Sequence, residues 1–91
     1  MTAEALERET RAYFDAQGFN TISTDTLQVG GLPAARNYFT FSTEDSLRYG
    51  MQIYVVDGST AYEISVESYN EGIFREHRHN IDSFVEGIRF L

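Results

Sequence analysis

Three segments in the middle of the chain alternate between apolar and polar residues with a period of two. They span residues 34–42, 47–56 and 60–68. In the first of them, Phe39 and Phe41 point to one side and Arg36 and Tyr38 to the other. Because successive side chains of a β-strand point to opposite faces, the pattern predicts three strands, each with one buried face. Short polar turns separate the strands, which predicts an antiparallel meander.

The two ends of the chain carry helical spacing instead. Residues 3–17 follow a favourable N-cap at Thr2 and precede Gly18, a residue type that commonly ends helices. The predicted apolar stripe of this helix consists of Leu6, Tyr13 and Phe14. Residues 70–88 predict one continuous second helix, because apolar residues recur there every three or four positions. That stripe consists of Ile73, His77, Ile81, Phe84, Val85 and Ile88.

The remaining segment, residues 19–29, is rich in threonine and predicts one or two short strands. Gly30 and Gly31 form a turn, and Pro33 stands at the start or edge of the next strand. The order is therefore helix, three to five antiparallel strands, helix, which predicts a single α+β domain over residues 1–91. The pattern leaves open whether the helices cover one face of the sheet or both.

Composition narrows the classes of function. The 91 residues include no cysteine and no lysine, and 14 acidic residues against seven arginines give a net charge of −7. This charge disfavours nucleic acid and anionic membranes as partners, because both require a basic surface. No apolar run approaches the roughly 20 residues of a membrane span. The N-terminus lacks an apolar stretch of signal-peptide length, so the chain as given is expected to be cytoplasmic.

The candidates for catalysis are weak. His77 and His79 lie about 200° apart on a helix and cannot ligate one metal ion, with His77 expected on the apolar stripe and His79 on the solvent face. Glu63 and Glu67 share one strand face but stand about 13 Å apart, too far to share a proton. The chain has no nucleophile motif and no glycine-rich phosphate loop. We therefore expect no enzyme, no cofactor and no metal site.

One surface feature favours protein binding. The strand faces opposite the apolar ones carry tyrosine and arginine, which are enriched at the energetic centres of interfaces. The candidate protein-binding residues are Arg36, Tyr38, Arg48, Gln52 and Tyr54, with Val56 beside them. In the alternative interpretation, one helix covers this face and the tyrosines belong to the core.

From Gly30 onward, the chain resembles the PsbP-like superfamily, which includes the bacterial DcrB-type proteins. The resemblance lies in the segments GGLPAARNYFTF, YGMQIYVVDGSTAYEISV and IFREHRHNIDSFVEGIRF. Members commonly enter a strand through a Gly-x-Pro-Ala sequence, here Gly31, Pro33 and Ala34, and end near a Ser–Phe pair, here Ser83 and Phe84. The chain would be a minimal version, because it lacks the extra N-terminal strands of larger members.

The resemblance implies non-enzymatic work, since similar proteins include a photosystem II subunit, a Ran-binding adaptor and chaperones that hold secreted toxins. The preferred hypothesis is a protein-binding or chaperone-like module whose partner is of unknown identity. A second is a homo-oligomer, such as a homodimer, that pairs through the same face or edge to edge through residues 24–29. A third is a small-molecule-binding or enzymatic domain with a pocket between sheet and helices. Its polar candidates are Tyr49, Tyr62, Glu63 and His77.

Overall fold

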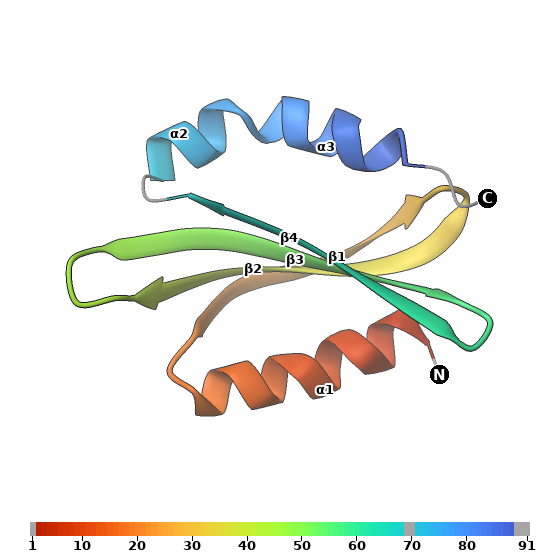
Figure 1. The fold of residues 1–91 in the computed structure, drawn as a ribbon, viewed down its shortest axis with the longest axis horizontal. Helices are drawn as coiled ribbons and strands as arrows, with labels where there is room; N and C mark the ends of the chain where they lie inside the picture. The colour runs from red at the N-terminus through yellow and green to blue at the C-terminus, as the bar shows by residue number, and fades with distance from the viewer. Residues whose placement is uncertain (1, 69–70, 89–91) are drawn as a thin grey trace.

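The computed structural model describes residues 2–68 and 71–88 and confirms the α+β fold with a strand meander. The elements are α1 (Ala3–Ala16), β1 (Asn20–Val29), β2 (Leu32–Ser42), β3 (Leu47–Asp57), β4 (Thr60–Ser68), α2 (Glu71–Glu76) and α3 (Arg78–Glu86). Within the described ranges, the strands form one antiparallel sheet in the order β1-β2-β3-β4. The sheet lies between two helical layers, with α1 on one face and α2 and α3 on the other (Figure 1). The helices therefore cover both faces.

Helix α1 begins where the sequence predicts and ends one residue earlier than predicted, at Ala16. The Thr2 hydroxyl accepts a hydrogen bond from the Ala5 amide at 3.1 Å, and Gly18 follows the helix with a left-handed φ of 94°. The predicted apolar stripe is only partly right, because Tyr13 is exposed. The buried residues of α1 are instead Ala3 and Glu7, and Glu7 is only 4% exposed.

Strand β1 is one continuous strand rather than two short ones. The pairing register with β2 shifts between Thr21 and Ser23, which leaves Ile22 as the extra residue of a β-bulge. The predicted turn at Gly30 and Gly31 is confirmed, since both residues have positive φ and connect β1 directly to β2. Two consecutive positive φ values are typical of the type I′ turn that matches the twist of a hairpin.

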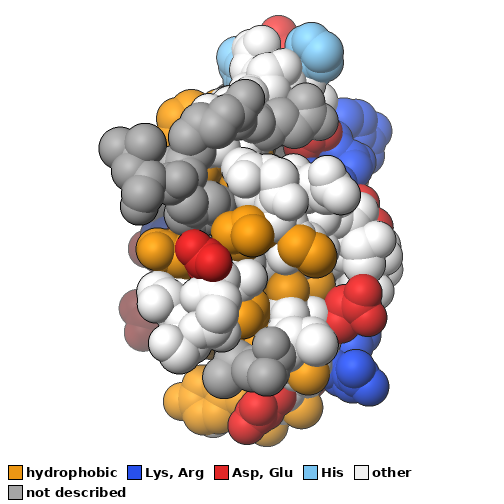
Figure 2. Space-filling view, turned by 90° about the vertical axis from the view of Figure 1, so that its right-hand side faces the viewer, with side chains coloured by type: hydrophobic (Ala, Val, Ile, Leu, Met, Phe, Trp, Pro, Cys, Tyr) orange, Lys and Arg blue, Asp and Glu red, His pale blue; other side chains and the backbone are white. Residues whose placement is uncertain are grey.

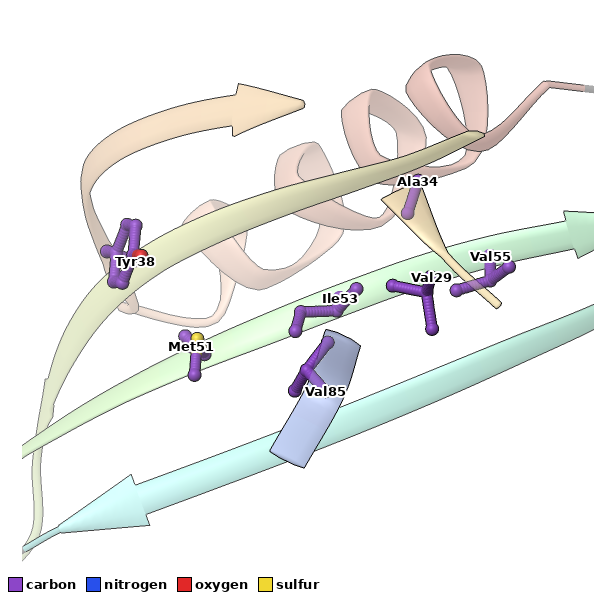
Figure 3. Packing of buried hydrophobic residues seen from close by; sticks show 7 residues of the cluster. All are labelled: Val29, Ala34, Tyr38, Met51, Ile53, Val55 and Val85. Carbon is purple, nitrogen blue, oxygen red and sulfur yellow. The ribbon is translucent and has the colours of Figure 1, made fainter. Parts of the chain in front are cut away.

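The main core lies between the sheet and α3. It consists of Val29, Ala34, Tyr38, Met51, Ile53, Val55 and Val85. Figure 3 shows the side chain of Val85 reaching from α3 onto the sheet beside Ile53. Smaller apolar contacts from Ile64, Val66, Ile81 and others surround this cluster. The core is continuous because alternate residues of all four strands point to this face.

The opposite face holds an aromatic cluster beneath the end of α1. The ring of Phe19 packs against Phe14, Phe39 and Phe41, with centroid distances of 5.0, 5.4 and 4.7 Å. Opposite Phe39 in the register with β3 stands Gly50, where there is no side chain to compete for space. The cluster therefore fills the space between the sheet and the C-terminal end of α1.

The single C-terminal helix predicted over residues 70–88 is wrong in one respect, because it is broken at His77. The break lets α2 pack on β3 and β4 while α3 reaches β1, so the two pieces follow the twisted sheet. His77 is exposed rather than on a buried stripe, and Phe84 is 70% exposed while its neighbour Val85 is fully buried. Residue 70 and the side chain of Ile73 lie outside the described part of the chain.

Candidate functional site

The five predicted binding residues do not share one face of the sheet. Across the β2–β3 pair, Arg36 stands opposite Ile53 and Tyr38 opposite Met51. Paired residues of an antiparallel sheet point to the same face, so Arg36 and Tyr38 lie on the side of α2 and α3. The other three candidates lie on the α1 side of the sheet, and they are Arg48, Gln52 and Tyr54.

Four of the five residues are also buried, and Arg48 is half-buried. Tyr38 is 8% exposed and Tyr54 is 2% exposed, and Arg36 and Gln52 are buried as well. The prediction of an exposed interface formed by these five side chains is therefore wrong. The alternative interpretation, that the tyrosines belong to the core, is right for both faces, because a helix packs on each of them.

On the α2/α3 side, Arg36 connects three elements. Its Nε and Nη2 donate to the two carboxylate oxygens of Asp25 on β1, at 2.8 and 2.7 Å. Its Nη1 donates to Asp82 of α3 at 3.1 Å. The hydrogen bonds to Asp25 raise the pKa of Arg36 above its usual value. Arg36 is therefore a structural tie between β1, β2 and α3.

Tyr38 is held between two arginines on this side. The guanidinium carbon of Arg36 lies 5.2 Å from the centre of the Tyr38 ring, and that of Arg78 lies 4.6 Å from it. Arg78 Nη2 also donates a hydrogen bond to Tyr38 Oη at 2.6 Å. Burial raises the pKa of the Tyr38 phenol above its usual value. These cation–π and hydrogen-bond contacts secure α3 on the sheet.

On the α1 side, a polar chain runs from the interior towards β4. Tyr54 Oη donates to Gln52 Oε1 at 2.9 Å, and Gln52 Nε2 reaches Glu63 Oε1 at 3.5 Å. Ser65 Oγ donates to the same Glu63 oxygen at 3.1 Å. Burial, together with the negative charge of Glu63, raises the pKa of Tyr54 to about 12. The chain of contacts orders the Glu63 side chain at the edge of the sheet.

Glu7 is a buried carboxylate that the sequence pattern did not reveal. Its Oε1 lies 3.3 Å from Arg11 Nε without an aligned hydrogen bond, and its neighbour on the sheet is Asn37. Burial raises the pKa of Glu7, although Arg11 and Arg8 oppose this shift. The i, i+4 spacing of Glu7 and Arg11 is typical of an exposed helix pair, so nothing local distinguished it from a surface residue.

Replacing Glu7 with glutamine is expected to remove a pH-dependent part of the stability. Because the folded-state pKa is raised above 4.5, the contribution of Glu7 is fully present below that pH and is lost as pH rises through the folded value. From acidic to neutral pH, wild type should lose on the order of 1 kcal/mol of unfolding free energy relative to Glu7→Gln. Urea unfolding followed by circular dichroism measures this difference. Identical pH profiles would contradict it, and the exposed substitution Glu4→Gln serves as the control.

Two hollows bear on the pocket hypothesis. One, of about 170 Å³, lies at the bulge and is lined by Tyr38, Tyr49, Arg75, Arg78 and others. Of the four pocket candidates, Tyr49 lines it, whereas Tyr62, Glu63 and His77 are exposed and do not. Its volume is below the roughly 300–1,000 Å³ of small-molecule sites. The other, of about 510 Å³, is an open groove between α1 and β1, and the charged residues that line it from α1 are Glu4, Glu7, Arg8 and Arg11.

In the part of the chain that the structure describes, the outer edge of β4 is both regular and open. Strand β4 pairs with β3 from Thr60 to Ser68 without a register shift, and within the described residues no strand lies on its other side. A two-residue turn joins Asp57 to Thr60, so the two residues that close the turn exchange backbone hydrogen bonds. From this pair onward, hydrogen-bonded and non-hydrogen-bonded residue pairs alternate along β3 and β4. The backbone N–H and C=O groups that point outwards consequently belong to Ala61, Glu63, Ser65 and Glu67.

The β1 edge differs from the β4 edge. Its bulge at Thr21–Ser23 interrupts the ladder, a device that commonly protects edge strands from pairing. Val29 and Leu32 close the turn between β1 and β2 as a hydrogen-bonded pair, and backbone groups that point towards β2 then alternate with groups that point away from it. The backbone N–H of Thr26 therefore points outwards from β1. Seen from the end of the sheet where both tight turns lie, apolar side chains emerge between the two helical layers (Figure 2).

Among the described residues, no three His, Cys, Asp or Glu side chains come together in a way that could hold a metal ion. No helix in the same part of the chain is long and apolar enough to cross a membrane. Comparison of the chain with protein-family models, curated proteins and solved structures finds no match. The edge of β4 is therefore the candidate site on geometric grounds.

Proposed function

We propose that this chain is a non-enzymatic protein-binding module that takes up an extended segment of another protein along the outer edge of β4. The observation that carries the proposal is the nine-residue ladder between β3 and β4, which has no bulge and, among the described residues, no strand on the outer side of β4. An edge of this kind offers alternating donors and acceptors to an incoming strand. Strand addition of this type is a recurring mode of peptide recognition.

The side chains of β4 also suit such a partner. Tyr62 is 39% exposed, and Ile64 and Val66 are half-buried on the same side of the strand. An added strand would place its own side chains about 5 Å from these residues and cover their free surface. The backbone would then supply affinity and the apolar side chains part of the selectivity.

The resemblance to the PsbP-like superfamily favours the same class of function, because it implies non-enzymatic protein binding. It does not bear on the position of the site, since partners differ widely between proteins of one fold. The position rests on the geometry of β4 alone. The burial of Arg36, Tyr38, Gln52 and Tyr54 removes the face that the sequence pattern favours for binding.

The test uses Ser65→Pro, which removes one outward N–H of β4 while leaving the β3–β4 ladder intact. A displayed library of random unstructured peptides is selected on the wild-type protein. We expect the enriched peptides to bind Ser65→Pro about tenfold more weakly, since a lost main-chain hydrogen bond and the bulk of the proline ring both act there. Ser65→Ala keeps the N–H and removes only the hydroxyl that bonds Glu63, so it should retain clearly more peptide binding than Ser65→Pro.

A second proline variant controls for general effects of proline in an edge strand. Thr26→Pro removes an outward N–H from β1 and should leave peptide binding unchanged. Far-ultraviolet circular dichroism and thermal unfolding establish that each variant is folded. Peptides that bind Ser65→Pro as well as wild type, loss of binding with Thr26→Pro instead, or the absence of any enriched peptide would each overturn the proposal.

A further inference from the structure

We infer that the segment bound along β4 is basic, with lysine or arginine at alternate positions on the α1 side of the strand and apolar residues between them. The inference rests on the proposed function and adds the chemistry of the partner. It follows from the two sides of β4, which differ in character, and from the residues already in contact with them.

The side of β4 that faces the α1 layer is acidic and open. Its residues are Ala61, Glu63, Ser65 and Glu67, all exposed. Helix α1 packs mainly on β1, β2 and β3, so it leaves this side of β4 to solvent. Two of these four side chains are carboxylates, and the other two are too small to shield the carboxylates from solvent. An incoming strand would therefore place its facing side chains against negative charge.

The charges on this side are only partly balanced. Arg48 Nη1 lies 3.7 Å from Glu67 Oε2, a loose ion pair with a half-exposed carboxylate. The hydrogen-bond donors to Glu63 are the neutral groups of Gln52 and Ser65. These donors hold the Glu63 side chain in place but do not neutralise its negative charge. A guanidinium or ammonium group from a partner would find an ordered acceptor there.

On the other side of β4, a partner strand would contact apolar side chains. Tyr62, Ile64 and Val66 point to the α2/α3 side, where the core lies, and they are incompletely covered. A strand has a period of two, so a segment that alternates basic and apolar residues would satisfy both sides at once. This alternation specifies the partner more narrowly than an open edge does.

A second copy of the chain fits this edge poorly. Antiparallel pairing of two β4 strands would bring Glu63 and Glu67 of both copies onto one side of a joined sheet, and like charges on facing strands are destabilising. Each copy also carries a net charge of −7. The charge therefore favours a basic segment of a different protein over a homodimer at this edge.

Two synthetic peptides of equal length test the inference, one alternating valine with arginine and the other alternating valine with glutamine. Fluorescence anisotropy should give a dissociation constant about fivefold lower for the arginine peptide, as expected from two partly exposed ion pairs. The double variant Glu63→Gln/Glu67→Gln should abolish this preference. The double variant Glu4→Gln/Glu44→Gln, which changes the net charge equally at exposed sites away from β4, should retain it.

The outcomes separate the inference from the proposed function. If both peptides bind equally and Ser65→Pro weakens both, the inference is overturned and the proposed function stands. If Ser65→Pro leaves the binding of both peptides unchanged, or neither binds, the proposed function fails and the inference with it. Light scattering that detects a wild-type dimer lost in Ser65→Pro would assign the edge to a second copy and overturn the inference.

Discussion

Replacing Arg36 with alanine is expected to lower the free energy of unfolding by about 3 kcal/mol. The Arg36 side chain is 9% exposed, and its guanidinium forms ion pairs with both Asp25 and Asp82. Its removal leaves two carboxylates close together on the α2/α3 side without the cation that they share. The partly exposed carboxylates can recruit water, which keeps the loss at the lower end of the range for buried pairs. Urea unfolding of Arg36→Ala at neutral pH measures the change.

A triple variant isolates the charge from the packing of the side chain. Arg36→Met keeps an apolar stem, and adding Asp25→Asn and Asp82→Asn removes the two unpaired charges. This triple variant should recover at least half of the lost stability, because a buried ion pair and an apolar replacement are often nearly equivalent. Amide exchange in α3 should increase in Arg36→Ala more than in the triple variant. A loss below about 1 kcal/mol for Arg36→Ala would contradict the role of Arg36 as a structural tie.

Replacing Gly50 with alanine is expected to cost about 2 kcal/mol through overpacking. An added Cβ would lie 2.6 Å from Phe39 Cζ and 3.0 Å from the carbonyl oxygen of Val66. The first contact is far too close, and the second involves the backbone of β4, which cannot move freely. Phe39 also packs against Phe19, so its ring has little room to withdraw. The effect arises from space alone, because Gly50 has an ordinary strand conformation.

A double-mutant cycle tests this explanation. In Phe39→Leu the nearest ring atoms are absent, so Gly50→Ala should cost clearly less in that background than in wild type. The coupling energy should be on the order of 1 kcal/mol, as is usual for residues in direct contact. Gly58→Ala is the control for the cycle: it strains the turn at a φ of 61° but places its methyl group in open space, so its effect should add to that of Phe39→Leu without coupling. Additive effects of Gly50→Ala and Phe39→Leu would rule out the ring contact as the cause.

Local periodicity was enough to locate most of the elements. The strand predicted over residues 60–68 matches Thr60–Ser68, and the one predicted over residues 47–56 ends one residue later, at Asp57. The predicted cap at Thr2 and the positive φ at Gly18 are also present. These features depend on hydrogen bonds and side-chain alternation within a few residues, so neighbouring sequence contains the information.

The candidate site depended on relations between elements. Alternation within β2 and β3 was predicted correctly, but the register that pairs Arg36 with Ile53 decides which residues of the two strands share a face. A shift of one residue would exchange the faces, and the sequence of one strand does not encode its phase relative to the next. For that reason Tyr38 and Tyr54, expected on one outward face, lie on opposite faces of the sheet, and the helices that cover those faces bury both of them.

The sequence by itself determined the α+β class, the strand meander, both tight turns and the start of the first helix, because short-range alternation and capping specify them. Only the tertiary structure decided that helices cover both faces, that Glu7 is buried, that the last helix breaks at His77, and that β4 rather than β1 presents the regular open edge. These outcomes follow from packing between segments distant in sequence, where the twist of the sheet and the space under each helix select the arrangement.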